Sequence, residues 1–161
     1  MPESSRLFVF TSDALLSDSY SATLVANINV FLSSWAAHGN PLFANSTLIS
    51  NRVLVISVDE SAASASGCSI DSLTNFIKSE GASSGIDFFN RSWVLYRNPV
   101  ADHTNFTDDW TTEPLHAFWA RRKAGLINDD TQVLNTTVTT LTDARENLVQ
   151  TFSDSWHASM W

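Results

Sequence analysis

The chain has 161 residues, of which 43% are hydrophobic and 16% charged, and its formal net charge is −8 at pH 7. We expect a single globular domain over residues 1–161, because 6 Trp and 10 Phe in a chain of this length describe a packed core rather than disorder. The acidic balance disfavours nucleic acid as a partner, since the one basic run, at 121–123, cannot neutralise a phosphate backbone.

The sequence also argues against a membrane or secreted protein. No apolar stretch approaches the roughly 18 residues that a membrane span needs, and the N-terminus lacks the charged and apolar regions of a secretory signal. A single cysteine forms no internal disulfide, which agrees with a reducing compartment. We therefore expect a cytoplasmic protein with no membrane partner, while the oligomeric state is left open.

The start of the chain predicts a strand and a long helix. Residues 6–11 are rich in aromatic and β-branched side chains, which is typical of a strand. Residues 18–37 then place apolar side chains at helical spacing, and Gly39 ends the pattern. The apolar stripe of this helix consists of Leu24, Ile28, Phe31, Leu32 and Trp35.

Two strands and a second helix follow. Residues 42–49 and 52–58 are separated by two residues, a spacing that predicts a tight hairpin. The second of these strands is almost continuously apolar, as expected of a strand buried on both faces. After a loop of small residues, a helix is expected with Ser66 or Ser69 as its cap and Gly81 at its end.

The second half of the chain predicts shorter elements. Residues 92–97 predict a strand and residues 101–112 a surface loop. A short helix is expected from Pro114 to about residue 123, followed by a strand over 132–138. A last helix is expected to begin at Thr142 or Asp143 and to carry Leu148, Phe152 and Trp156 on one face.

These elements predict an α+β fold with a mainly antiparallel or mixed sheet and helices packed on it. The predicted order is β-α-β-β-α-β-α-β-α, whose first six elements have the order of a ferredoxin-like unit, with α-β-α as an extension. The hairpin between the second and third strands rules out an all-parallel sheet.

Cys68 marks the first candidate site, because it lies where the small-residue loop SAASASG meets the second helix. Small residues let backbone N–H groups approach a ligand, and the N-terminus of a helix favours anions. We expect a pocket here, with Cys68 flanked by the ligand-binding residues Ser66, Gly67, Ser69 and Asp71. The alternative is a serine-rich connector in which the cysteine acts as a small hydrophobic residue.

His38 is the candidate partner of Cys68. It lies just past the end of the first predicted helix, in the run WAAHG, and a thiol nucleophile needs a base or an ion-pair partner. Whether the two side chains meet is left open by the sequence, and His38 can equally serve as a helix C-cap. Trp35 of the same run is expected to contact the ligand.

Asp59 and Glu60 are also expected to contact the ligand, because they end the central strand next to the small-residue loop. With Asp71 they could hold a hard cation such as magnesium, although turn and capping roles are the more common use of such residues. The sequence contains no HExxH, CxxC or EF-hand pattern, so no dedicated metal site is expected.

Nucleotide cofactors are not expected. The only lysines are Lys78 and Lys123, neither follows a glycine, and no P-loop can be drawn. The dinucleotide fingerprint G-x-G-x-x-G is missing as well. We expect no bound cofactor and no P-loop ATPase activity.

The runs WAAHG and SGCSIDS, the pair Asp59-Glu60 and the late run SWH together resemble a bacterial family of similar length. Members of that family often carry the label "ABC transporter ATPase", and the missing P-loop argues against the label. The resemblance spans most of the chain but implies no activity, so no catalytic role is carried over. It implies only that the following residues match the family's pattern: Trp35, His38, Gly39, Ser66, Gly67, Cys68, Ser69, Ile70, Asp71 and Trp156.

The sequence thus favours a cytosolic protein that binds a small anionic ligand, or a partner, near Cys68. The alternative is a thiol-dependent enzyme with Cys68 as nucleophile and His38 as base or ion-pair partner. A third hypothesis is a structural interaction protein that uses the aromatic tail from Trp156 to Trp161.

Overall fold

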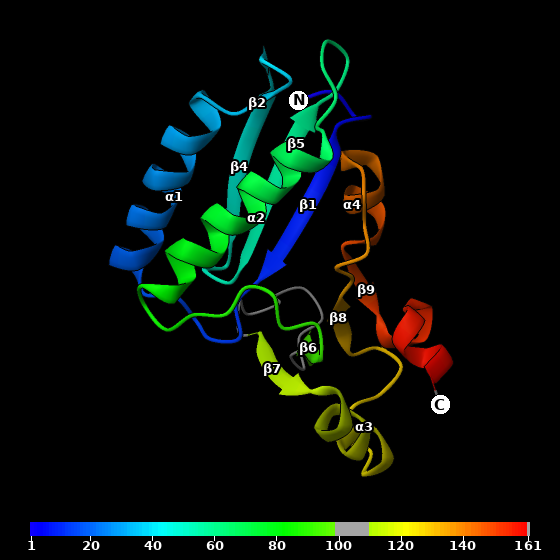
Figure 1. Ribbon diagram of the computed structural model, residues 1–161. Coiled ribbons are helices and arrows are strands. Elements are labelled where there is room, and N and C mark those ends of the chain that lie inside the picture. Colours follow the sequence, from blue (N-terminus) through cyan, green and yellow to red (C-terminus); the bar gives the residue numbers. More distant parts are fainter. Residues whose placement is uncertain (99–109, 161) are drawn as a thin grey trace. The chain divides into compact units, whose positions relative to one another are not determined.

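The computed structural model describes residues 1–98 and 110–160, whose contacts group into two compact units (Figure 1). Unit 1 comprises residues 1–90 and 137–145, and unit 2 comprises residues 91–136 and 146–161. Both contain helices and antiparallel strands, so the α+β class is confirmed. The single domain stays a prediction, and most of the loop expected over 101–112 lies outside the described residues.

Unit 1 contains a three-stranded antiparallel sheet. Its strands are β1 (Arg6–Thr11), β4 (Phe43–Ile49) and β5 (Val53–Asp59), in the order β1-β5-β4. The predicted hairpin between β4 and β5 forms, with positive φ at Ser50 and Asn51, but Ile49 pairs with Val53, so its turn has three residues, 50–52, instead of the two predicted. β5 is the central strand, as its apolar run predicted, but burial on both faces was too strong an expectation, since Val55 and Ser57 are only half-buried.

Helices α1 (Asp18–Ser33) and α2 (Gly67–Ala82) cover one face of this sheet (Figure 1). The two helices run antiparallel, since the Tyr20 hydroxyl near the start of α1 donates to the carbonyl of Glu80 near the end of α2. The core between helices and sheet is formed by apolar residues that include Leu24, Ile28, Leu32, Leu54, Ile56, Val58, Leu73 and Ile77.

The three strands keep the order of the first three strands of a ferredoxin-like sheet, but the fourth position differs. The free edge of β1 is joined by the segment before α4 (Leu141–Asn147): the Leu7 amide donates to the carbonyl of Thr139 at 2.8 Å, and Arg6 bridges Thr140. The strand expected over 92–97 does form, as β6 (Trp93–Arg97), but it belongs to the sheet of unit 2.

The first helix ends four residues earlier than predicted. After the C-cap Ser34 the chain forms a small hairpin of β2 (Ala36–Ala37) and β3 (Asn40–Pro41). Its two turn residues, His38 and Gly39, have φ values of 51° and 78°. Two consecutive positive φ values are those of a type I′ turn, so Gly39, which was expected to end the helix, belongs to the turn of a hairpin.

Unit 2 contains a four-stranded antiparallel sheet in the order β7-β6-β8-β9, with β7 at Thr111–Pro114, β8 at Gln132–Leu134 and β9 at Val149–Thr151. Helix α3 (Leu115–Lys123) follows β7 directly, which confirms the short helix predicted after Pro114. The buried cluster of this unit is formed by Val94, Tyr96, Phe118, Ile127, Val133 and Phe152.

The last predicted helix does begin as expected, but its extension through Leu148, Phe152 and Trp156 is wrong. Helix α4 ends at Asn147, and the chain continues as β9 and two 3-10 helices, η1 (Phe152–Asp154) and η2 (Trp156–Met160). Pairing of β9 with β8 satisfies backbone groups that a continued helix would have used internally. The apolar residues at spacing four therefore do not share a face: Phe152 is 3% exposed and Trp156 is 41% exposed.

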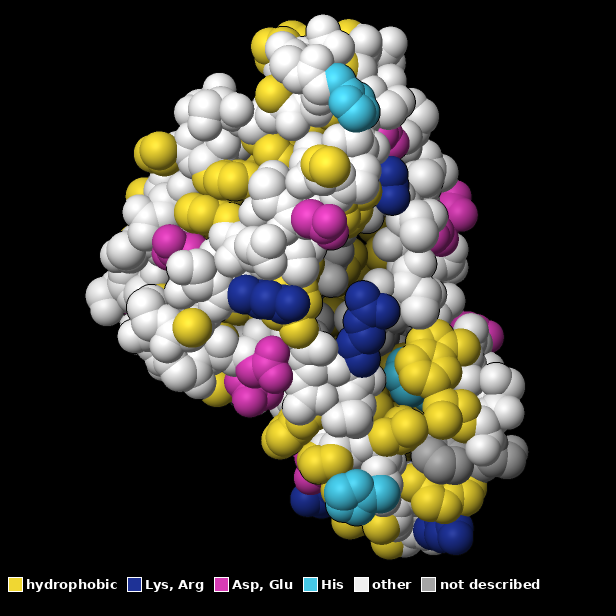
Figure 2. Space-filling model, in the orientation of Figure 1, with side chains coloured by type: hydrophobic (Ala, Val, Ile, Leu, Met, Phe, Trp, Pro, Cys, Tyr) yellow, Lys and Arg dark blue, Asp and Glu magenta, His cyan; other side chains and the backbone are white. Residues whose placement is uncertain are grey.

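The surface is chemically mixed. On the face drawn in Figure 2, lysine and arginine side chains are scattered rather than gathered into one patch. Large apolar side chains are exposed at separate positions, among them Val30, Phe43, Leu126 and Met160. In the described part of the chain, no helix combines the length and the apolar character that crossing a bilayer requires.

Candidate functional site

The start of α2 is fixed by a capping box. The Ser69 amide donates to Ser66 Oγ at 3.2 Å, and the Ser66 amide donates to Ser69 Oγ at 2.7 Å. Ser69 Oγ in turn donates to the carbonyl of Ser66 at 2.8 Å. This confirms Ser66 as the cap, and it means that both hydroxyls predicted to bind a ligand are already used to order the first helical turn.

Gly67 and Cys68 remain available at this helix end. The first backbone bond of α2 is donated by Ile70 to the carbonyl of Ser66, so the N–H groups of Gly67 and Cys68 precede the helical ladder. Both residues are exposed, and the first turn of α2 carries no acidic side chain. An exposed thiol therefore lies beside two backbone donors at the positive end of a 16-residue helix.

Trp35 holds the other side of this helix start. Its side chain is 3% exposed, and Nε1 donates to the carbonyl of Ser69 at 2.8 Å. The ring lies 6.2 Å from that of Phe31, which stacks on Phe76 of α2 at 4.5 Å. Trp35 was predicted to contact a ligand, and the structure gives it a buried role that ties the end of α1 to the first turn of α2.

Asp59 and Glu60 order the loop between β5 and α2. Asp59 Oδ1 accepts from the Ser61 amide at 3.0 Å, and this backbone hydrogen bond holds the pKa of the Asp59 carboxyl below its ordinary value. Glu60 Oε2 accepts from the Ala65 amide at 2.8 Å, and Oε1 lies 4.0 Å from Arg6. These are turn contacts, the alternative that the sequence left open.

The three carboxylates considered for a cation do not form a site. Asp71 is exposed on the second turn of α2, while Asp59 and Glu60 are engaged with the loop. Among the described residues, no group of three or more His, Cys, Asp and Glu side chains is placed to hold a metal ion.

His38 lies at the exposed tip of the β2–β3 hairpin, at the same end of unit 1 as the start of α2 (Figure 1). It is a turn residue and not the helix C-cap considered from the sequence; that cap is Ser34. Within the described part of the chain, the side chains of His38 and Cys68 are not joined by a hydrogen bond. The structure thus brings their segments to one end of the unit without linking the two groups.

Comparison with known proteins adds no assignment to this geometry. No family model, curated protein or solved structure matches the chain. The resemblance drawn from WAAHG and SGCSIDS therefore stays a hypothesis, and the site is judged on its own chemistry.

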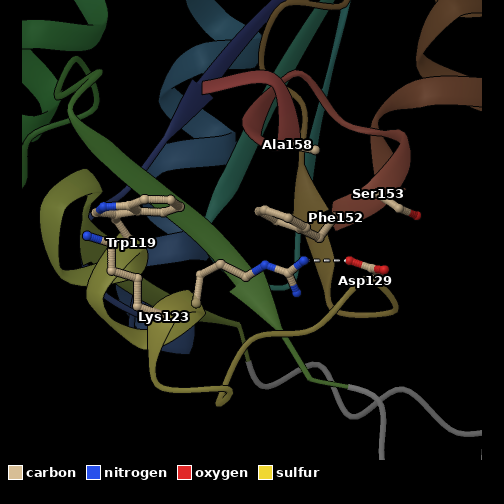
Figure 3. A pocket seen from close by; sticks show the side chains of 7 residues that line it. Trp119, Lys123, Asp129, Phe152, Ser153 and Ala158 are labelled. Atoms are coloured by element: carbon tan, nitrogen blue, oxygen red, sulfur yellow. Dashed lines mark hydrogen bonds and ion pairs between the residues drawn. The ribbon is translucent and has the colours of Figure 1, made fainter. Parts of the chain in front are cut away.

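Unit 2 contains a pocket that the sequence analysis missed. It has a volume of about 510 Å³ and is lined from α3, from the turn before β8 and from the 3-10 helices (Figure 3). None of the residues predicted to form a site with Cys68 lines it, although Ala158 belongs to the tail segment 156–161 considered from the sequence. The one signal in the sequence is the spacing of Trp119 and Lys123, four residues apart on a helix, which places both side chains on one face.

The pocket combines aromatic rings with cations. Lys123 Nζ lies 4.9 Å from the centre of the Trp119 ring, and the Arg122 guanidinium lies 4.6 Å from the centre of the Phe152 ring. Arg122 also pairs with Asp129 at 2.7 Å, the contact drawn as a dashed line in Figure 3. These contacts hold charged groups against aromatic faces, an arrangement favoured by the negative face of a ring.

Proposed function

We propose that this protein binds a small anionic ligand, or an acidic group of a partner, at the start of α2. The observation that carries the proposal is the pair of N–H groups at Gly67 and Cys68, exposed beside the Cys68 thiol. A helix N-terminus presents donors and a partial positive charge to an anion. The capping box and the bond from Trp35 to Ser69 hold these donors in place before a ligand arrives.

The chain offers an internal comparison. Helix α1 has Asp18 in its first turn, so its positive end is already partly compensated, whereas α2 has no acid there. An anion is therefore expected to choose the start of α2 over that of α1. The side chain of Asp71 lies one turn further along α2 and does not share the first-turn position.

A titration of the ¹⁵N-labelled chain with inorganic phosphate, followed by amide NMR, tests the proposal. The Gly67 and Cys68 amides are expected to shift in a saturable way, while the amides at the start of α1 do not. Cys68→Asp places a carboxylate at the anion's position and is expected to abolish the shift, and Cys68→Ser is the neutral control that keeps it. Small shifts of equal size at the starts of α1 and α2, or shifts that do not saturate with phosphate, would contradict the proposed anion site.

A thiol-dependent enzyme is the second candidate, favoured by one observation. The hydrogen bond from Trp35 to Ser69 joins the segment that carries His38 to the turn that carries Cys68. If His38 assists the thiol, His38→Gln is expected to slow alkylation of Cys68 by iodoacetamide. His116→Gln, which removes another exposed histidine, is the matched control. Equal alkylation rates in the two variants would leave Cys68 without a partner and exclude this candidate.

A further inference from the structure

The unit 2 pocket has a charge distribution that the chain as a whole does not have. The net charge of the chain is −8, yet the side chains around the pocket include Arg122 and Lys123 against one carboxylate, Asp129. Arg122 is paired with Asp129, whose side chain is 68% exposed. Lys123 has no carboxylate partner among the described residues. One positive charge is therefore left uncompensated at the rim.

The neighbouring histidine does not change this balance. His157 lies in η2, next to the pocket residue Ala158, and is 2% exposed. Burial lowers its pKa to about 4, so the ring is neutral at physiological pH. Its ring stacks on Trp156 at 3.8 Å and contacts Phe118 at 5.9 Å. His157 thus supports the apolar floor of unit 2 rather than adding a cation.

The cation next to Phe152 is held in one position before any ligand binds. Arg122 Nη1 donates to the carbonyl of Ile127 at 3.2 Å, Nη2 contacts Asp129, and the guanidinium covers Phe152. Lys123, by contrast, is exposed and ends a flexible stem, so its ammonium can follow an anionic group. The pocket therefore offers one fixed and one adaptable cation.

Two aromatic side chains, Trp119 and Phe152, line the pocket. Figure 3 shows Trp119 and Phe152 pointing toward one another from opposite sides of the pocket. Phe152 is 3% exposed and is covered by Arg122, whereas Trp119 is half-buried and lines the pocket next to Lys123. A flat ring is thus expected to stack on Trp119, and the volume of about 510 Å³ is sufficient for a ligand of one or two fused rings.

We propose that this pocket binds a small flat aromatic ring that carries a carboxylate, with the ring on Trp119 and the carboxylate at Lys123. The proposal uses residues of unit 2 only and does not rest on the anion site proposed at α2. A ring without a carboxylate lacks the ion pair with the Lys123 ammonium, and an anion without a ring lacks the stacking on the Trp119 indole. A surface lysine alone would bind any anion weakly, whereas Lys123 next to Trp119 favours an anion that also carries a ring.

Naphthalene-2-carboxylate and its neutral counterpart naphthalene-2-methanol test the proposal. Binding is measured by NMR from the indole N–H signal of Trp119, which is assigned by its loss in Trp119→Leu. The carboxylate is expected to bind about fivefold more tightly than the alcohol, the effect of one exposed ion pair. Inorganic phosphate, which has no ring, is expected to leave the Trp119 signal in place.

The two lysines of the chain give a matched pair of variants. Lys123→Gln is expected to remove the preference for the carboxylate and to leave the affinity for the alcohol unchanged. Lys78→Gln is the control, because Lys78 also lies over a ring, that of Phe89 at 5.2 Å, but belongs to unit 1. Equal affinities for the two ligands, equal behaviour of the two variants, or no response of Trp119 at millimolar ligand would each overturn the proposal.

Discussion

Trp35→Ala should lower the free energy of unfolding and loosen the start of α2, whereas Cys68→Ser should leave the free energy of unfolding almost unchanged. The indole is 3% exposed and buries on the order of 200 Å². At about 25 cal/mol per Å² this gives an upper limit of roughly 5 kcal/mol, which compact unfolded chains reduce. The buried hydrogen bond to Ser69 contributes about 1 kcal/mol. We expect a loss of about 3–5 kcal/mol for Trp35→Ala.

Trp35→Phe separates the two contributions. It keeps a ring in the core and removes the Nε1 donor, but the carbonyl of Ser69 still accepts from the Ser72 hydroxyl at 2.8 Å. The carbonyl is therefore not left without a partner, and the expected loss is only about 1–2 kcal/mol. Cys68→Ser changes an exposed side chain and is expected to stay within about 0.5 kcal/mol of the parent protein.

Urea unfolding followed by far-UV circular dichroism measures these differences. Where two variants have the same dependence of the free energy of unfolding on urea concentration, a change in the midpoint reports a change in stability. If Cys68→Ser loses as much stability as Trp35→Ala, Cys68 is part of the core and the site proposed at α2 fails. If Trp35→Ala is nearly neutral, the bond from Trp35 does not order the helix start.

Three further changes have defined outcomes. Gly81→Ala should destabilise by about 1–3 kcal/mol in urea unfolding, because a Cβ there would overlap the carbonyl oxygen of Ile86, while Gly67→Ala, with open space around it, should be tolerated. Ser66→Ala should cost about 1 kcal/mol through loss of the cap, and an unchanged midpoint would contradict the capping box. His157 is neutral in the folded protein, because burial lowers its pKa to about 4. Its contribution to the free energy of unfolding is therefore complete above pH 6.5, and about 2–3 kcal/mol of it is lost as the pH falls from 7 to 4.5. His157→Gln should lack this part of the pH dependence, and parallel pH curves would refute it.

The elements of unit 1 could be predicted because their signals are local. The strand β5, the hairpin after β4 and the serine cap of α2 each depend on neighbouring residues, and all three are observed, although the hairpin turn is one residue longer than predicted. The end of α1 was missed for the opposite reason. Trp35 continues the helical stripe in sequence, but the positive φ of His38 and Gly39 turns the chain back into a hairpin.

Unit 2 was harder to predict because its order comes from pairing between distant segments. β6 pairs with β7 and β8, and β8 pairs with β9. Each of these pairs joins two strands that are separated along the chain by other segments. The spacing of Leu148, Phe152 and Trp156 fits a helix, but pairing of the residues around 150 with β8 overrides that local preference. The pocket was missed with it, since its residues come from α3 and from the 3-10 helices that replace the expected helix.

The candidate site at α2 shows the same division between local and distant information. Sequence identified the exposed thiol and the cap, but the partner of Trp35 lies 34 residues away and could not be foreseen. That contact changes the chemistry of the site, because it gives Trp35 a supporting role, while Gly67 and Cys68 are the exposed residues of the first helical turn. A motif can thus combine residues that bind with residues that hold the binding groups in place.

The net charge of −8 limits what either proposed site can recognise. At physiological ionic strength, charges more than about 8 Å apart are largely screened, so an anion responds mainly to the groups next to it. At α2 those groups are backbone donors and a thiol, which favour a compact anion. At Lys123 the neighbouring indole adds stacking, which favours a ligand with a ring. The two sites therefore differ in the ligand they select, and inorganic phosphate against an aromatic carboxylate distinguishes them on one sample.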